Sequence, residues 1–409
     1  MQKLYKNVRK EDLHEWFDLE FTVPQGTVEL ELRVKCPGKV HLMLYGPDAY
    51  RGMLDKDKDK IIIKEDFASK GFLSGLIPGL WKIKVEILDV PHEMTLEIGL
   101  ETKNAHKRWY AGDFHTHSVH SDGKHLVSDM VTIAKAYGLD FFALTDHNSY
   151  AQNEEVAEDF VILPGLELTT PKGHSNFVGI KRPFESFDYR TKESLYKMFD
   201  QGMDAGCFIS VNHPFVGDVW KWGFDMKFHA IELWNGTPLS RNQGALDWWQ
   251  EELSRGCKVL ATGGSDVHVH DLSGRCFGRG RTLVLADSLS RKHLLEGLHR
   301  GNISVATCEK SGFVDLKIGD TRVGETYYLK NEKQLKLDID LLMDEPSELK
   351  LYTNEGLVAS YNLDGHELSK NLLIPVGHKF YRLELWGRNN THAFFTNPIY
   401  IERQKMHTI

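Results

Sequence analysis

Two histidines spaced two residues apart, His115 and His117, open the part of this sequence that is richest in possible metal ligands. Side chains alternate between the two faces of an extended strand, so residues at this spacing project to the same face. The two imidazoles can therefore bind one ion together. Asp266 and His268 repeat the spacing with one oxygen ligand and one nitrogen ligand.

Further carboxylates and imidazoles occur in short clusters that also contain glycine, serine or asparagine. These clusters are Ser121-Asp-Gly, Thr145-Asp-His-Asn, Gly165-Leu-Glu, Gly173-His-Ser-Asn and Asn212-His-Pro. Together with the two pairs, they supply nine candidate ligands: His115, His117, Asp122, His147, Glu167, His174, His213, Asp266 and His268. Mixed nitrogen and oxygen ligands suit zinc, manganese or iron, and no cluster contains the cysteines of a thiolate-rich structural zinc site.

Short apolar runs come directly before several of these clusters. Phe141-Phe-Ala-Leu-Thr precedes His147, and Cys207-Phe-Ile-Ser-Val precedes His213. Such runs are typical of strands that are buried on both faces, and helix-like patterns such as Leu126 to Tyr137 lie between them. Strands that alternate with helices over about 200 residues predict parallel β/α units. Because catalytic groups from many strand ends converge at the mouth of a β/α barrel, the ligands favour a barrel over an open sheet.

Alternating apolar and polar residues dominate the sequence before about Arg108 and after about Ser311, as in Leu80-Trp-Lys-Ile-Lys-Val-Glu-Ile and Leu335-Lys-Leu-Asp-Ile-Asp-Leu. This period of two predicts antiparallel strands with one solvated face, most simply in β-sandwiches. A chain of 409 residues is also too long for one ordinary core. We therefore predict three domains: a β-sandwich-like domain over 1–108, an α/β barrel over 109–308 and a second β-sandwich-like domain over 309–409.

The composition is that of a folded, soluble protein, with 41% hydrophobic and 26% charged residues. A net charge of -8 argues against general binding of nucleic acid, which needs a basic face. It does not exclude a small anionic substrate, because bound cations would invert the local field. Five scattered cysteines without a Cys-x-x-Cys pair argue against a disulfide framework. Since no apolar run suits a signal peptide or a membrane span, we expect a cytoplasmic protein that does not enter the membrane.

In their order along the chain, these clusters resemble the successive motifs of the PHP family, which is named for polymerase and histidinol phosphatase. The matching motifs are Asp113-Phe-His-Thr-His-Ser, Ser121-Asp-Gly, Thr145-Asp-His-Asn, Gly165-Leu-Glu, Asn212-His-Pro and Ser265-Asp-Val-His. The resemblance covers residues 109 to 308. The flanking β domains and the closing Phe394-Phe-Thr-Asn-Pro-Ile-Tyr-Ile look more like the CehA/McbA-like metallohydrolases, a branch named after a carbamate-insecticide hydrolase.

The resemblance implies a distorted (β/α)7 PHP barrel that holds two or three divalent metal ions (Zn, Mn or Fe) at its strand ends. The implied ligands form three groups, of which the first two share Glu167 as a bridge. They are His115, His117, Glu167 and Asp266 for a first ion, Glu167, His174 and His213 for a second, and Asp122, His147 and His268 for a third. At the third position, Asp122 supplies a carboxylate where some relatives have a histidine.

The chemistry expected of such a centre is hydrolysis. Two ions ~3.5 to 4 Å apart can share a hydroxide, lower the pKa of that water and stabilise both the attacking and the leaving oxygen. In this scheme the bridging hydroxide is the nucleophile, and Asp266 accepts its proton, because a carboxylate bound to one ion can still reach the shared water. With Glu167 as the bridge, we predict a phosphoesterase whose substrate is a small anionic phosphomonoester or phosphodiester.

Two other hypotheses remain open. The same centre could attack a carbamate, ester or amide carbonyl, and fold and metal set do not separate the two reactions. Phosphate-directed cations at the mouth would favour the phosphoester, and an enclosed aromatic pocket would favour the carbonyl. The candidate phosphate-directed cations are Lys124, Arg241, Arg275 and Arg279. The candidate residues of an aromatic pocket are Trp220, Trp222, Trp234, Trp248 and Trp249, although Trp248 and Trp249 better suit a packed helix. The third hypothesis is a non-catalytic protein that binds carbohydrate or protein, but its vestigial barrel should have lost ligands.

Overall fold

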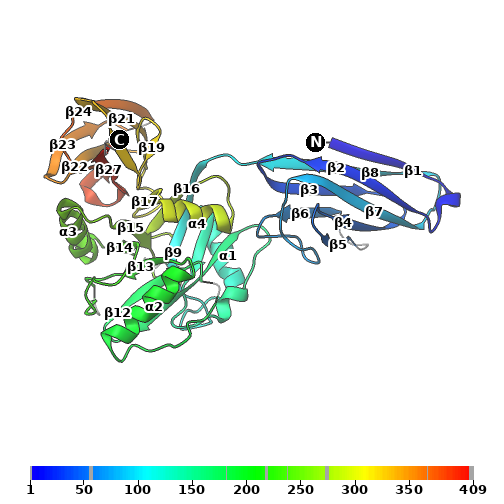
Figure 1. Ribbon diagram of the computed structural model, residues 1–409, viewed down its shortest axis with the longest axis horizontal. Helices are drawn as coiled ribbons and strands as arrows, with labels where there is room; N and C mark the ends of the chain where they lie inside the picture. The colour runs from blue at the N-terminus through cyan, green and yellow to red at the C-terminus, as the bar shows by residue number, and fades with distance from the viewer. Residues whose placement is uncertain are drawn as a thin grey trace, which may run out of the picture. The chain divides into compact units, whose positions relative to one another are not determined.

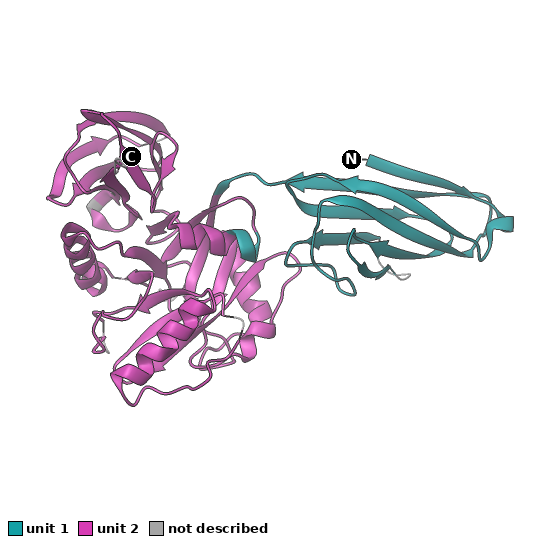
Figure 2. Cartoon of the chain, in the orientation of Figure 1, with its two compact units in different colours: residues 1–108, 290–293 teal, residues 109–289, 294–409 magenta. Residues whose placement is uncertain are grey.

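The computed structural model describes residues 2–54, 59–180, 182–216, 220–236, 238–271, 276–365 and 367–404. The chain divides into two compact units, which Figure 2 shows in different colours. The first unit comprises Met1–Arg108 with Ser290–His293, and the second comprises Trp109–Leu289 with Leu294–Ile409. The division of the chain into three domains stays a prediction.

Two antiparallel sheets make up the first unit. Their strand orders are β1-β8-β3-β6 and β2-β7-β4-β5. The strands are β1 (Gln2–Val8), β2 (Trp16–Val23), β3 (Thr27–Lys35), β4 (Lys39–Tyr45), β5 (Tyr50–Leu54), β6 (Lys60–Lys64), β7 (Gly79–Asp89) and β8 (Met94–Asn104). Along β7, every second residue from Trp81 to Ile87 is buried, and these side chains join one hydrophobic cluster with Leu30 and Leu32 of β3. The antiparallel sheets predicted for this part are confirmed.

The ligand-bearing part of the second unit combines a mixed sheet with helices (Figure 1). Its strands are β9 (Arg108–Thr116), β10 (Phe141–Leu144), β11 (Val161–Thr170), β12 (Gly173–Val178), β13 (Phe208–Asn212), β14 (Ala230–Asn235), β15 (Leu260–Gly264), β16 (Arg281–Ala286) and β17 (Ile303–Ala306). The described residues contain four α-helices: α1 (Val127–Ala136), α2 (Lys192–Asp204), α3 (Leu239–Arg255) and α4 (Arg291–Arg300). None of these helices is long and apolar enough to cross a membrane.

Strands β9 to β15 are consecutive neighbours in this sheet. The first and last strands of this run, β9 and β15, also approach each other. The N–H of Asp266, just after β15, donates to the carbonyl of His115 on β9 at 2.9 Å. In the same region the N–H of His117 donates to the carbonyl of Val267 at 3.1 Å. The hydroxyl of Thr282 on β16 also bonds to the backbone of β15 at Gly263. These contacts bring the last of the seven strands back to the first and give a distorted barrel.

The prediction of parallel β/α units is correct for part of this barrel and wrong for the rest. Strand β10 is parallel to β9 and β11, and β14 is parallel to β13 and β15. Strand β12, however, is antiparallel to both β11 and β13. Only Pro171 and Lys172 separate β11 from β12, which is far too short for a helical crossover and therefore forces a hairpin. A mixed sheet with four helices in the described residues replaces the expected (β/α)7 repeat.

The remaining strands of the second unit form two further layers, which are antiparallel except that β20 pairs in parallel with β27. They are β18 (Phe313–Ile318), β19 (Thr321–Arg322), β20 (Thr326–Leu329), β21 (Gln334–Leu342), β22 (Ser347–Thr353), β23 (Gly356–Leu363), β24 (Leu368–Pro375), β25 (Phe380–Gly387), β26 (Ala393–Thr396) and β27 (Ile399–Arg403). One layer has the order β19-β18-β21-β24, and the other continues from the barrel as β17-β26-β25-β22-β23. Leu337 and Ile339 of β21 and Leu349 and Leu351 of β22 belong to the hydrophobic cluster that both layers share.

Asn397, which lies between β26 and β27, links this β region to the barrel. Its side-chain oxygen accepts a hydrogen bond from the N–H of Ala261 on β15 at 2.8 Å. Its amide nitrogen donates to the carbonyls of Ala261 and Ile303, both at 3.0 Å. The buried amide thus satisfies backbone groups of β15 and β17 as a neighbouring strand would. This contact explains why an asparagine stands in the closing Phe394-Phe-Thr-Asn-Pro segment.

Replacing Asn397 with alanine should lower the free energy of unfolding by about 3 kcal/mol, because it leaves buried backbone groups without partners. Chemical denaturation monitored by circular dichroism would measure the loss. Asn371→Ala on β24 is a suitable comparison, because Asn371 is exposed and makes no side-chain contact of this kind. Equal stability of the Asn397 and Asn371 variants would contradict the linking role.

Candidate metal centre

The barrel closure brings the nine candidate ligands to the same end of the sheet. His115 lies on β9 and Glu167 on β11, while His213 directly follows β13 and Asp266 is the second residue after β15. His213 and Asp266 have φ angles of 27° and 54°, in the left-handed region that side chains other than glycine seldom adopt. Backbone strain of this kind is retained where a side chain must point in a particular direction.

Glu167 is the centre of the cluster, and its side chain is fully buried. Oε1 lies 3.1 Å from Nε2 of His115, 3.3 Å from Nδ1 of His174 and 3.6 Å from Nε2 of His213. Oε2 lies 2.7 Å from Nδ1 of His147 and 3.7 Å from Nε2 of His117. Five imidazoles, two of them from the end of β9, therefore surround one carboxylate.

Asp266 lies on the other side of the two paired histidines. Its Oδ1 is 3.1 Å from Nε2 of His117 and 3.4 Å from Nε2 of His115. Its Oδ2 is 3.9 Å from Nε2 of His213 and within reach of the side-chain amide of Asn235, at 3.4 Å. The two imidazoles of His115 and His117 thus stand between two carboxylates, Glu167 and Asp266.

The geometry contains groups of ligand atoms close enough to share an ion. In each group the ligand atoms lie within 4.8 Å of one another. One group consists of His115, His117 and Glu167, and a second consists of Glu167, His174 and His213. They correspond to the first and second positions implied by the sequence, with Glu167 common to both. Asp266 completes the first through its contacts with both histidines.

The third group is the most open part of the cluster. It contains Asp122, His147 and His268, and His117 also lies within reach. Oδ1 of Asp122 is 3.3 Å from Nε2 of His268 and 3.6 Å from Nε2 of His147. The side chain of Asp122 is 58% exposed and that of His268 is 32% exposed, whereas Glu167 is completely covered. The cluster is therefore most exposed to solvent on this side.

Glu232, a residue that the sequence motifs do not include, lies directly behind His115. It is 2% exposed and sits in the middle of β14. Its Oε1 is 3.0 Å from Nδ1 of His115, and its Oε2 accepts a hydrogen bond from the N–H of His213 at 2.9 Å. A carboxylate on Nδ1 keeps the proton there and leaves Nε2 free to act as a ligand. A glycine is needed at position 264, because a Cβ there would lie 2.3 Å from Cβ of His115 and 2.8 Å from Oε1 of Glu232.

The missed signal was a charged residue inside an apolar run. Ala230-Ile-Glu-Leu-Trp reads as a strand buried on both faces, and a buried carboxylate requires a partner. The sequence does not say which partner, because Glu232 and His115 are 117 residues apart.

Two other aspartates in the motifs, Asp113 and Asp146, have structural contacts instead of ligand contacts. Asp113 accepts hydrogen bonds from the N–H groups of Ser265 at 2.9 Å and Gly278 at 2.8 Å, and so ties β9 to the segments around β15 and β16. Burial raises the pKa of its carboxyl to about 6. Asp146 accepts hydrogen bonds from both the N–H and the hydroxyl of Ser118, each at 2.8 Å. Both residues hold loops in place around the ligands.

The cluster fits a metal centre on two observations. First, Nε2 of His115 and Nδ1 of His117 are buried and make no hydrogen bond to a described residue, an arrangement that is costly unless another partner is bound. Second, burial disfavours a charged His115, yet the carboxylates of Asp266, Glu167 and Glu232 raise its pKa well above the ordinary value. Burial also opposes ionisation of Glu167, but the charge of His115 and hydrogen bonds from histidines hold its pKa well below the usual range. Positive charge is therefore stabilised at this position.

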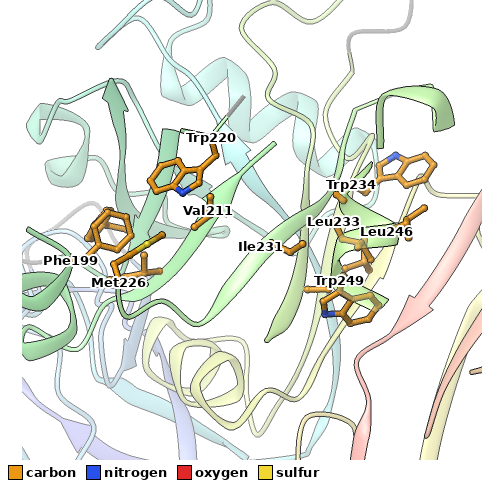
Figure 3. Packing of buried hydrophobic residues seen from close by; sticks show 14 of the residues in the cluster. Phe199, Val211, Trp220, Met226, Ile231, Leu233, Trp234, Leu246 and Trp249 are labelled. Carbon is orange, nitrogen blue, oxygen red and sulfur yellow. The ribbon is translucent and has the colours of Figure 1, made fainter. Parts of the chain in front are cut away.

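The tryptophans proposed as an aromatic wall belong to the core instead. Trp220, Trp222, Trp234 and Trp249 are buried in one hydrophobic cluster with residues of α2, α3 and the barrel strands, and Trp248 packs against it. Figure 3 shows Trp220 and Trp249 in separate parts of this cluster. The expectation that Trp248 and Trp249 pack a helix is confirmed, since both lie on α3.

Among the candidate cations, Lys124 lies nearest the open group along the backbone. Its N–H donates to the carbonyl of His268 at 2.7 Å, and its side chain is exposed. Arg241 is also exposed, and Arg279 is half-buried. Arg275 lies outside the described residues.

Comparisons with known proteins find similar solved structures at low sequence identity. No protein family model and no curated protein matches the chain. A solved structure of a two-domain protein from Bacteroides vulgatus, which contains a predicted PHP-like metal-dependent phosphoesterase, is 21% identical, with 72% of this chain and 96% of that chain covered and a TM-score of 0.43. A candidate metal-dependent phosphoesterase from Bifidobacterium adolescentis is 16% identical over 39% of this chain and 87% of that chain, with a TM-score of 0.29.

An amidohydrolase from Chromobacterium violaceum, solved with bound sulfate, is also similar. It is 16% identical, covers 41% of this chain and 93% of its own, and has a TM-score of 0.28. At these levels of similarity, none of the three structures supports an assignment of activity to this chain. The chemistry has to be inferred from the residues of the cluster.

Proposed function

We propose that this chain is a PHP-type metal-dependent hydrolase that cleaves a phosphoester. The observation that carries the proposal is the convergence of five imidazoles on the buried carboxylate of Glu167, with Asp266 facing it across His115 and His117. A carboxylate shared in this way is the ligand expected between two cations. The buried Nε2 of His115 and Nδ1 of His117, which hydrogen-bond to no described residue, support the same interpretation.

The residues of the cluster have separate roles in the proposed reaction. Divalent zinc, manganese or iron bound here would supply positive charge and a water of lowered pKa. Glu167 would hold two ions, and Glu232 would keep Nε2 of His115 directed at them. Asp266 is the candidate base that accepts a proton from the attacking water, because Oδ2 is the less crowded of its two oxygens.

The charge of the cluster favours a phosphoester over a neutral carbonyl substrate. Four carboxylates, Asp122, Glu167, Glu232 and Asp266, lie in or directly behind it. Two divalent ions would neutralise these carboxylates, and a third would leave the site with a positive charge that a phosphate would compensate. Burial of the candidate tryptophans also removes the aromatic wall that would have favoured a carbamate, ester or amide.

A substrate panel tests the reaction. Initial rates should be measured for p-nitrophenyl phosphate, bis-p-nitrophenyl phosphate, nucleotides and an aryl carbamate, each with manganese and with zinc. We expect turnover of at least one phosphoester and a much lower kcat/KM for the carbamate. Preferential cleavage of the carbamate would contradict the phosphoester assignment while keeping the hydrolase, and no turnover of any substrate by protein that holds metal would count against hydrolysis.

Replacing Asp122 with alanine should weaken binding at the third position by roughly tenfold or more, since the variant loses the only carboxylate of that group. The two positions around Glu167 should keep their ions, because Asp122 is exposed and contacts neither. Metal titration followed by elemental analysis would measure this, with Asp129→Ala on α1 as a control for an exposed aspartate nearby. An unchanged metal content in the Asp122 variant would contradict a third position.

A further inference from the structure

A cavity of about 290 Å³ lies between α3 and strands β22 and β25, all within the second unit. None of the nine candidate ligands lines it. Its walls combine polar side chains of α3, such as Gln243 and Asp247, with Tyr352, Glu384 and Trp386 of the two strands. The volume is near the lower end of the ~300–1,000 Å³ of small-molecule pockets, which suits a ligand of one or two rings.

Hydrogen bonds hold the floor of this cavity in a fixed arrangement. Arg382 is 2% exposed, and its guanidinium lies over the rings of Trp249 at 4.7 Å and Tyr352 at 4.3 Å. It donates to Oε1 of Gln250 at 2.7 Å and to Oε1 of Glu384 at 2.6 Å. A floor whose side chains are already bonded to one another needs little rearrangement to receive a ligand.

The same network fixes the orientation of the aromatic wall. Oε2 of Glu384 accepts a hydrogen bond from the indole N–H of Trp386 at 2.7 Å. Because the indole N–H is satisfied inside the protein, the ring presents its carbon surface without exposing an unpaired donor.

The cations of the lining are already neutralised. Arg382 pairs with Glu384, and Nζ of Lys350 lies 3.1 Å from Oε2 of Glu348. Asp247 accepts a hydrogen bond from Gln243 at 2.8 Å but forms no ion pair with a described residue. An anionic ligand would therefore meet unneutralised negative charge, and an apolar ligand would bury polar groups without partners.

We propose that this cavity binds a neutral sugar or a similar polyhydroxylated molecule. Each hydroxyl group of such a ligand donates one hydrogen bond and accepts others, which matches a wall that mixes the carboxylate of Asp247, the amide of Gln243 and the hydroxyl of Tyr352. Trp386 is 8% exposed, with Nζ of Lys350 5.5 Å from its ring centroid, and contributes to the wall as a fixed apolar group. The proposed site is separate from the metal centre and does not depend on the proposed hydrolase.

Binding should be measured by ligand-observed NMR and calorimetry on the full chain. The probes are glucose, galactose, N-acetylglucosamine, maltose and cellobiose, with glucuronate, inorganic phosphate and glycine as charged comparisons. We expect saturable binding of at least one neutral sugar and weaker binding of all three comparisons. Metal-free and metal-loaded protein should give the same affinity, which separates this result from any activity of the metal centre.

Two conservative variants locate the binding. Asp247→Asn keeps the shape of an exposed side chain, and Tyr352→Phe keeps the ring beside Arg382 while removing its hydroxyl. Each should weaken sugar binding about tenfold, because Asp247→Asn turns one acceptor oxygen into a donor and Tyr352→Phe removes a hydroxyl. Glu251→Gln, on the same helix but outside the cavity lining, should leave it unchanged. The absence of saturable sugar binding, tighter binding of a comparison compound, or equal affinity in all three variants would overturn the proposal.

Discussion

Replacing Glu167 with alanine is expected to release at least one ion from the metal centre and to lower kcat/KM by roughly a thousandfold or more, since several kcal/mol of charge stabilisation depend on those ions. Both oxygens of Glu167 face imidazoles that belong to different ligand groups. Glu167 is the carboxylate that the first and second ligand groups have in common. Metal content per chain and initial rates would be measured on the same preparation.

A second variant distinguishes the loss of metal binding from a failure of the chain to fold. Glu167→Gln keeps the size of the side chain and a carbonyl oxygen that can accept the hydrogen bond from the amide of Asn212, at 2.8 Å in the native chain. It should therefore stay folded by circular dichroism, with intact β domains, and still lose metal and activity. Retention of both metal and activity in the two variants would contradict the bridging role.

Replacing Glu232 with glutamine should lower metal affinity by roughly 10- to 100-fold, the range seen when a residue behind a ligating histidine is changed. The glutamine can still occupy the space beside Gly264, but it removes the charge that holds the proton on Nδ1 of His115. Competition with a chromophoric chelator would measure the affinity, and nitrogen-15 NMR of the histidines would report the tautomer of His115.

The two readouts separate positioning from a purely structural effect. A structural defect would lower stability and metal binding without a specific change in the His115 spectrum. Glu232→Asp should fall between the native chain and the glutamine variant, because it keeps the charge but shortens its reach. Native metal affinity in Glu232→Gln would show that the contact with His115 does not orient a ligand.

Local sequence patterns predicted the parts of the fold that depend on short-range order. The alternating residues of β7 and the helix-like stretch at α1 match elements of the structure. The reversal of β12 could have been predicted from Pro171 and Lys172 alone, because so short a connection excludes a crossover. The assumption that strands and helices alternate throughout this region led to the prediction of a parallel strand there instead.

The features that the sequence patterns did not predict depend on contacts between residues far apart in the chain. The return of Asp266 to His115 and the contact of Asn397 with Ala261 join segments more than a hundred residues apart. Each partner looks locally like an ordinary polar residue at the end of a strand. The ligand clusters could be recognised because several of them follow one another in a known order along the chain. Glu232, in contrast, is a single charged residue in an apolar strand.

Elemental analysis tests the central claim most directly. The chain would be purified, reconstituted separately with zinc, manganese and iron, and freed of loosely bound metal before its content is measured. We predict at least two equivalents of a divalent metal per chain, reduced in the Glu167 variants. A chain that retains no metal after reconstitution, and hydrolyses none of the panel substrates, would contradict the metal centre and restore the hypothesis of a non-catalytic binding protein.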